Sequence, residues 1–176
     1  ETAVTLQNPT KTGYTFGGWY TNNSFSGSAV TQIAKGTTGD KEFYAKWTAN
    51  VYSITYKDKN NATFSGTFSG TYPTTYTYGQ TTTLVSPTKN GYTFIGWYAN
   101  KECTGNILTT ISSTTIEDIT LYAKWDIITY TILYNLYDGT NNADNPASYT
   151  IETNTITLQS PTKDGYTFGG WYTNNS

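Results

Sequence analysis

The sequence predicts a mainly β protein made of small tandem modules, and three observations support this prediction. Threonine accounts for 38 of the 176 residues and tyrosine for 17, and both residue types suit the pleated, half-buried surface of a strand. No segment keeps apolar residues at helical spacing for three turns. The string Pro-Thr-Lys-x-Gly-Tyr-Thr-Phe-x-Gly-Trp-Tyr occurs three times, and such internal repetition indicates an array of similar structural units.

The spacing of two repeated strings defines the limits of each module. The glycine of Gly-Tyr-Thr-Phe is Gly13, Gly91 and Gly165, so the copies recur at nearly equal intervals. The string Tyr-Ala-Lys-Trp ends at Trp47 and Trp125, and both tryptophans lie equally far from the glycine that precedes them. We therefore predict one complete module, two partial modules and two connectors: a back portion at 1–47, a connector at 48–51, the complete module at 51–125, a connector at 126–129, and the front portion of a further module at 128–176.

The copies are nearly identical in places. Residues 165–176 repeat 13–24 without a change, and the chain starts at Glu1 rather than at methionine. Tandem duplication leaves copies this similar, so we expect the chain to be a section of a longer array. The connectors have only four residues, which leaves neighbouring modules little freedom. We expect an elongated, semi-rigid rod.

The first strand of the repeated pattern lies in the aromatic string. In 14–19, Phe16 and Trp19 are three residues apart, and a flat strand would send them to opposite faces. A β-bulge at the glycines would bring both side chains inward, because glycine adopts a positive φ at little cost. The predicted bulge glycines, one per copy, are Gly18, Gly96 and Gly170.

Two further strands follow from alternation. Phe43, Ala45 and Trp47 share one face of the segment 43–47, and 121–125 repeats this pattern. The segment 52–56 alternates large with small polar residues, and 130–134 echoes it. Together these strands predict a structural core in each copy, which consists of Phe16, Trp19, Phe43, Trp47, Ile54, Phe94, Trp97, Leu121, Trp125, Ile132, Phe168 and Trp171.

The two strings and their spacing resemble the Listeria–Bacteroides repeat, the family that includes the B repeat of internalin B. The resemblance covers nearly the whole chain. It implies β-grasp-like modules in an elongated array, within a bacterial protein that is secreted or held at the cell surface. In that family the array acts as a stalk or adhesive spacer, and the resemblance brings no catalytic residues to this chain.

Composition argues against several classes of function. The chain has no His, no Met and no Arg, which removes the side chain most used for proton transfer at neutral pH and the planar cation that grips phosphate. A net charge of −2 with ten scattered lysines gives no basic stripe for nucleic acid. No apolar run approaches the roughly 20 residues of a membrane helix. We therefore expect no enzyme activity, no cofactor, no metal site, no nucleic-acid partner and no membrane insertion in this segment.

The five tryptophans permit two interpretations. Exposed indoles would stack on sugars, whereas buried indoles would close the small cores, and their strict spacing favours the core. The alternative function is therefore a module that binds a host or matrix glycan or protein through other exposed aromatics. The candidate partner surface for that function consists of Tyr20, Tyr44, Tyr98 and Tyr122, each beside a core position.

The partial modules suggest a second kind of partner. An incomplete sheet leaves unpaired strand edges, which are templates for another chain. The segment 128–150 supplies strands that 1–47 lacks. We therefore expect the partners to be neighbouring repeats of the same chain or other copies of it, joined head to tail in a fibre.

Overall fold

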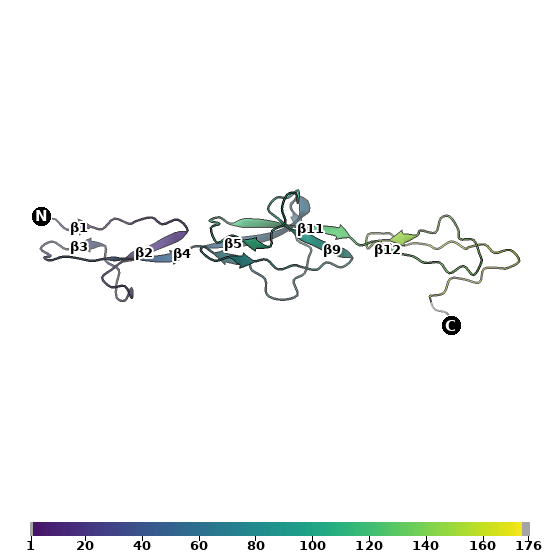
Figure 1. Ribbon diagram of the computed structural model, residues 1–176, viewed down its shortest axis with the longest axis horizontal. Coiled ribbons are helices and arrows are strands. Elements are labelled where there is room, and N and C mark those ends of the chain that lie inside the picture. Colours follow the sequence, from purple (N-terminus) through teal and green to yellow (C-terminus); the bar gives the residue numbers. More distant parts are fainter. Residues whose placement is uncertain (1, 174–176) are drawn as a thin grey trace. The chain divides into compact units, whose positions relative to one another are not determined.

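The computed structural model describes residues 2–173 and is mainly β, with short strands in small sheets (Figure 1). Within these residues the one helical element is a 3-10 turn, Lys59–Asn61. None of the helical structure in this range has the length and hydropathy of a membrane span. The chain forms two compact units, one of Glu1–Pro87 with Gly96–Lys124 and the other of Thr88–Ile95 with Trp125–Ser176.

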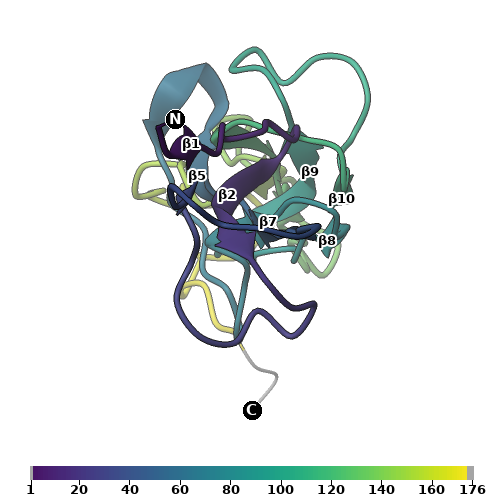
Figure 2. The same cartoon turned by 90° about the vertical axis from the view of Figure 1, so that its left-hand side faces the viewer.

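The back portion contains two antiparallel pairs of strands (Figures 1 and 2). Strand β1 (Val4–Thr5) pairs with β3 (Gln32–Ile33), and β2 (Tyr14–Tyr20) pairs with β4 (Tyr44–Ala49). The second ladder shifts register between Phe16, opposite Trp47, and Gly18, opposite Lys46. Gly18 has φ +114°, so the irregularity lies at a glycine that the aromatic spacing predicts as a bulge. The shift lets Phe16 pack against both Trp19 and Trp47, each with a ring-centroid distance of 5.4 Å.

The complete repeat contains a five-stranded mixed sheet. Its strands follow the order β6-β5-β11-β9, and β7 also pairs with β5. Strands β5 and β11 run parallel, with Ile119 opposite Ile54 and Leu121 opposite Tyr56. A separate pair, β8 with β10, repeats the pair β1 with β3. The bounds are β5 Val51–Asp58, β6 Ala62–Thr63, β7 Thr75–Thr77, β8 Thr82–Thr83, β9 Tyr92–Tyr98, β10 Thr110–Ile111 and β11 Ile119–Ile127.

The front portion at the C-terminal side has one short ladder, in which β12 (Tyr130–Thr131) pairs with β13 (Ser148–Tyr149). The aromatic string at 166–172 is not a strand, although its sequence is that of β2. This differs from the strand predicted in each copy. The physical reason is that the string forms a strand by pairing with the Tyr-Ala-Lys-Trp segment, as β2 does with β4, and residues 130–173 contain no such segment.

Burial of part of the predicted core differs between the complete and the partial repeats, whereas Phe94 and Trp125 are half-buried even in the complete repeat. In the complete repeat Ile54, Trp97 and Leu121 are 7%, 2% and 1% exposed. Their counterparts in the partial repeats are less covered, and Phe168 is exposed, contrary to its predicted place in a core. The predicted core residues that are half-buried are Phe16, Trp19, Phe43, Trp47, Phe94, Trp125, Ile132 and Trp171.

This contrast gives a first prediction. Trp97→Ala removes a buried indole and should lower the free energy of opening of the central sheet by about 3–5 kcal/mol. Trp19→Ala is the matched control, because Trp19 occupies the same place in the repeat but is only half-buried. Its effect on the back portion should be clearly smaller. Hydrogen exchange of the amides in β2, β5, β9 and β11 measures both, and equal losses would contradict the assignment of Trp97 to a closed core.

Candidate functional site

Each of the three tryptophans in the aromatic string is fixed by the same hydrogen bond. The indole Nε1 donates to the backbone carbonyl twelve residues upstream, in the pairs Trp19 to Gln7 (3.0 Å), Trp97 to Val85 (3.0 Å) and Trp171 to Gln159 (3.2 Å). Buried indoles usually find such a partner. The polar edge of each ring is therefore used inside its own repeat and is not free to bind a sugar hydroxyl.

The lysine of the same string lies over the tyrosine that follows it. The Nζ to ring-centroid distances are 4.1 Å for Lys11 and Tyr14, 4.0 Å for Lys89 and Tyr92, and 4.6 Å for Lys163 and Tyr166. In each copy the tyrosine N–H also donates to the lysine carbonyl, which closes a tight turn. A cation–π contact contributes about 0.5–1 kcal/mol at an exposed site, so these lysines have a structural role.

A cluster of aromatic rings covers Trp97 in the complete repeat. Tyr56 lies 4.8 Å from the indole, and Phe64 and Phe68 lie 5.6 and 6.1 Å from it. Tyr72 stacks on Phe68 at 3.9 Å. The Tyr56 hydroxyl donates to the Pro73 carbonyl (2.6 Å), and burial, assisted by the nearby Tyr72, raises the pKa of Tyr56 to about 12. Sequence reasoning missed this cluster because the segment 63–75 has no alternation.

The predicted tyrosine surface does not form as expected. Tyr20 and Tyr98 are buried, at 9% and 5% exposure, and Tyr44 and Tyr122 are half-buried. The prediction of an exposed row is therefore wrong for Tyr20 and Tyr98. The loop after β2 folds back and packs Phe25 on Tyr20 at 5.7 Å, and the lysines of the two Ala-Lys-Trp segments lie above the rings of Tyr20 and Tyr98.

Consecutive repeats meet at the glycine of Gly-Tyr-Thr-Phe. At the first junction Asn50 N–H donates to the Gly13 carbonyl (2.9 Å), and Tyr78 N–H donates to the Asn50 carbonyl (2.9 Å). The Tyr78 ring packs against Gly13 so closely that a Cβ at residue 13 would lie 2.4 Å from it. Gly13 also has φ +76°, which glycine adopts readily. The first junction is therefore a packed contact that only glycine fits.

The second junction repeats the first at the equivalent glycine of the next copy. Ile128 N–H donates to the Gly91 carbonyl (2.9 Å). A Cβ at Gly91 would lie 2.6 Å from the side chain of Ile151, which takes the place of Tyr78. The hydroxyl of Tyr92 also donates to the carboxylate of Glu152, and this hydrogen bond raises the pKa of Tyr92. Two junctions of different sequence thus use one geometry.

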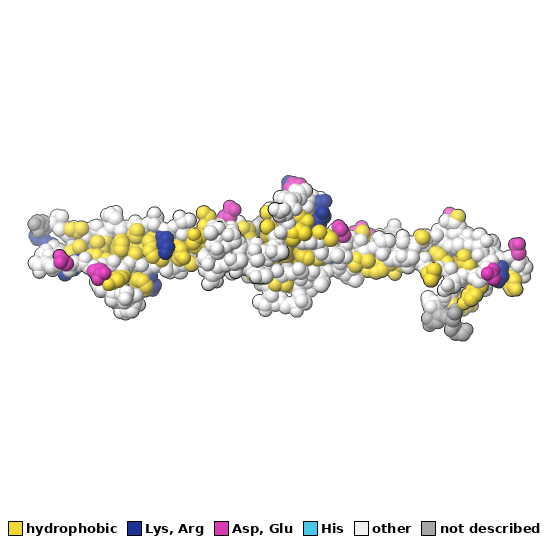
Figure 3. Space-filling model, in the orientation of Figure 1, with side chains coloured by type: hydrophobic (Ala, Val, Ile, Leu, Met, Phe, Trp, Pro, Cys, Tyr) yellow, Lys and Arg dark blue, Asp and Glu magenta, His cyan; other side chains and the backbone are white. Residues whose placement is uncertain are grey.

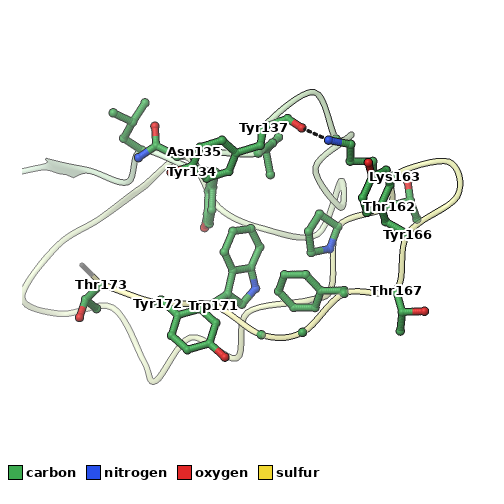
Figure 4. Close-up of a pocket in the computed structure, with 17 residues that line it drawn as sticks. Tyr134, Asn135, Tyr137, Thr162, Lys163, Tyr166, Thr167, Trp171, Tyr172 and Thr173 are labelled. Atoms are coloured by element: carbon green, nitrogen blue, oxygen red, sulfur yellow. Dashed lines mark hydrogen bonds between the residues drawn. The ribbon is translucent and has the colours of Figure 1, made fainter. Parts of the chain in front are cut away.

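An open groove lies in the front portion, within residues 133–173 (Figure 4). It has a volume of about 950 Å³, and Tyr134, Pro161, Phe168 and Trp171 contribute its apolar wall. Tyr134 and Trp171 keep the ring contact that Tyr56 and Trp97 make in the complete repeat, with centroids 5.3 Å apart. Two further lining residues, Leu133 and Tyr172, are 82% and 80% exposed.

Polar contacts hold the walls of this groove. Lys163 Nζ donates to the Tyr137 carbonyl (2.6 Å; Figure 4). The buried amide of Asn145 donates to the Gln159 carbonyl and accepts from the Gln159 N–H, at 2.9 and 2.7 Å. The same Gln159 carbonyl accepts from Trp171. The groove therefore has a defined wall even though the string at 166–172 forms no ladder.

The back portion exposes apolar side chains for a related reason. Figure 3 shows hydrophobic side chains gathered over the region of β2 and β4. Trp19 and Phe43 are half-buried there, whereas their counterparts Trp97 and Leu121 are buried, because β4 pairs with β2 and with no strand on its other edge among residues 2–173. In the complete repeat, β11 has β9 on one edge and β5 on the other.

The described residues hold no cluster of metal-ligating side chains, and the one cysteine among them is buried. Within residues 2–173 no three His, Cys, Asp or Glu side chains come together as metal ligands would. The thiol of Cys103 is buried against the carbonyls of Tyr122 and Ala123, at 3.9 and 3.8 Å, and burial raises its pKa. A raised pKa keeps the thiol protonated and unreactive at neutral pH.

One carboxylate links the first strand of the complete repeat, β5, to the residue that precedes its last strand, β11. Asp118 Oδ1 accepts the N–H of Ser53 (2.7 Å), and this hydrogen bond lowers the pKa of Asp118. Because the pKa is lower in the folded state, the ionised carboxylate stabilises the fold above the ordinary aspartate pKa of about 4. That contribution is lost as the pH falls from there through the lowered pKa.

We therefore predict that Asp118→Ala reduces stability at pH 7 and that its difference from the unmodified chain vanishes in acid. Asp126→Ala, which removes an exposed carboxylate from β11, the strand that begins directly after Asp118, is the control and should leave the acid dependence unchanged. Thermal unfolding followed by circular dichroism between pH 7 and pH 2 measures both. A constant difference between Asp118→Ala and the unmodified chain at every pH would contradict the role of ionised Asp118.

Comparison with known proteins identifies the repeated unit. The family model of the Listeria–Bacteroides repeat domain matches residues 1–46, 52–124 and 130–176. The chain is 32% identical over 166 residues to a protein of Evansella cellulosilytica named "Putative membrane protein", and the match covers 93% of this chain and 23% of that protein. It is 42% identical over 96 residues to internalin H of Listeria monocytogenes, with 49% and 15% of the two chains covered. The chain thus spans less than a quarter of the length of these relatives, and no solved structure matches it.

Proposed function

The chain belongs to the Listeria–Bacteroides repeat domain family, and we propose that it is a stalk or spacer section of a surface-anchored or secreted bacterial adhesin. The observation that carries this proposal is the packed junction between repeats. Gly13 and Gly91 occupy equivalent places and each meets a side chain of the following repeat. A chain that spaces a binding domain from a cell needs such restraint, since freely jointed repeats would collapse toward the surface.

The distribution of side chains also supports a spacer. The tryptophan nitrogens and string lysines are used within the repeats. Two of the four tyrosines suggested for a partner surface are buried. A relative named as a membrane protein supports an envelope or extracellular location. The absence of enzyme activity remains our proposal as well, on the chemical grounds of a chain without histidine.

We further propose that each complete repeat is a β-grasp-like module. The order β6-β5-β11-β9 supports this, since the first and last strands of the repeat lie side by side at the centre and run parallel. In a β-grasp these two central strands are flanked by the strands of two hairpin-like arms. Here the segment 63–75, with its aromatic rings over Trp97, takes the side of the sheet that a helix covers in larger members of that fold class.

The glycine junctions give a direct stability prediction. Gly165 has the same φ, +76°, as Gly13, but a Cβ there would meet nothing within 4 Å. Gly165→Ala therefore measures backbone strain alone, about 1–2 kcal/mol. Gly13→Ala and Gly91→Ala add a steric clash with Tyr78 and Ile151 and should cost more. Thermal unfolding compares the three variants, hydrogen exchange of the Asn50 and Ile128 amides shows whether the loss lies at the junctions, and equal losses at all three glycines would contradict a packed interface.

The spacer role itself requires a restrained junction in solution. Spin labels placed at the exposed residues Ser28 and Thr109, with Cys103 replaced by Ala, report the distance between the back portion and the complete repeat. We expect a narrow distance distribution that Gly13→Ala broadens. A distribution as broad as that of a flexible linker in the unmodified chain would overturn the spacer proposal.

A further inference from the structure

The first and last strands of the complete repeat are neighbours in its sheet and run in the same direction. Strand β5 pairs with β11 over residues 54–58 and 119–123, and both stretches belong to one compact unit. The chain enters the repeat at Val51, where β5 begins, and leaves it at Ile127, where β11 ends. Because the strands are parallel, these two points lie at opposite ends of the shared ladder. Tension on the chain therefore pulls the two strands past each other along their length.

The direction of the pull decides how this ladder resists it. The hydrogen bonds of a sheet run across its strands. A pull along the strands shears the ladder and loads all of its hydrogen bonds at the same time, whereas a pull that peels the strands apart loads them one after another. A ladder that is sheared therefore withstands a larger force than the same ladder when it is peeled. The parallel arrangement of β5 and β11 places the two ends of the repeat for shear.

We propose that the pairing of β5 with β11 is a mechanical clamp that carries tension through the complete repeat. This inference rests on the proposed spacer function, since a chain between a cell and a bound target is loaded at its two ends. It also goes beyond that function. A spacer needs length and restraint, whereas a clamp keeps the repeat folded while the chain is pulled.

Both loaded strands lie inside the sheet and not at its edge. In the order β6-β5-β11-β9, strand β5 has β6 on its outer side and β11 has β9, and β7 also pairs with the start of β5. Sliding of either strand therefore breaks pairing on both of its edges. The pairing of β5 with β7 includes Val51 opposite Thr77, so it begins at the residue where the tension arrives.

The side chains along the ladder prevent a gradual slip. Ile119 lies opposite Ile54, and Leu121 lies opposite Tyr56. Leu121 and Ile54 are 1% and 7% exposed. A shift of one residue would turn every buried side chain of the strand to the other face, so no partly slipped register keeps this core buried. The same burial keeps water, which competes for hydrogen bonds, away from this face of the ladder.

Two side-chain hydrogen bonds extend the clamp beyond the start of β11. Asp118 Oδ1 accepts the N–H of Ser53 (2.7 Å), directly before the first pair of the ladder. The hydroxyl of Tyr76, on β7, donates to the Glu117 carbonyl. The segment before β11 is therefore fixed to both β5 and β7 at the end of the ladder where β5 is pulled.

Force measurements on single molecules of the full chain test the clamp through the direction of the pull. Handles are attached to pairs of introduced cysteines, with Cys103, the one native cysteine, replaced by Ala. Val51→Cys with Ile127→Cys shears the ladder, and these positions are 61% and 38% exposed. Val51→Cys with Glu117→Cys is the matched control. Both of its handles lie at the same end of the two strands, so the pull peels them apart.

The sheared repeat should need a several-fold higher force to unfold than the peeled repeat at the same loading rate. In the sheared repeat a single event should lengthen the chain by roughly 25 nm, as the whole segment between the handles is extended. This length identifies the event as unfolding of the complete repeat. Equal forces in the two directions, or a sheared repeat that lengthens in several small steps, would overturn the proposal.

A second comparison separates the clamp from general stability. Leu121→Ala removes a buried side chain from the loaded ladder, whereas Ile111→Ala removes one of similar size from β10, which pairs with β8 in a separate sheet. Both variants should lose thermal stability, because each leaves a cavity. In the shear direction Leu121→Ala should lower the unfolding force clearly more than Ile111→Ala, and equal losses of force would contradict a load carried by β5 and β11. The comparison of directions needs neither substitution, so it decides the proposal even if one variant does not fold.

The clamp and the spacer function can fail separately. An unfolding force that is equally low in both directions, together with a narrow distance distribution between the spin labels at Ser28 and Thr109, would remove the clamp and keep the spacer. A broad distance distribution together with a high force in shear would remove the spacer and keep the clamp as a property of the repeat.

Discussion

The structure of each repeat depends on one strand being paired on both edges. In the complete repeat β11 lies between β5 and β9, and the side chains at the centre of that sheet, Leu121 and Ala123, are among the least exposed of the described residues. This pairing joins residues from the start and the end of the repeat, so it closes only when both are present. Where one side is absent within residues 2–173, Trp19 and Phe43 remain half-buried although their counterparts Trp97 and Leu121 are buried, and the string at 166–172 forms no strand.

The identical segments 13–20 and 165–172 separate local from long-range causes of structure. Both keep the lysine turn, the contact of lysine with tyrosine and the indole hydrogen bond to a carbonyl twelve residues upstream. Only the first is a strand, because only it has β4 as a partner. Short-range contacts thus fix the conformation at the start of the string and the position of its tryptophan. Strand formation belongs to the tertiary context, as is usual for β-structure.

The sequence predicted the mainly β class, the repeat family and the place of the Gly18 bulge, since these depend on composition, on strings and on a spacing within one strand. It also predicted that Trp97 and Leu121 lie in a core. It could not predict the burial of Tyr20 and Tyr98, because alternation assigns a side chain to a face and says nothing of a loop that covers that face. The sequence also did not predict the parallel pairing of β5 with β11 or the rings over Trp97, because both are contacts between segments that lie far apart in the chain. The groove of the front portion likewise joins distant segments, since residues 133–139 and 161–173 line it together.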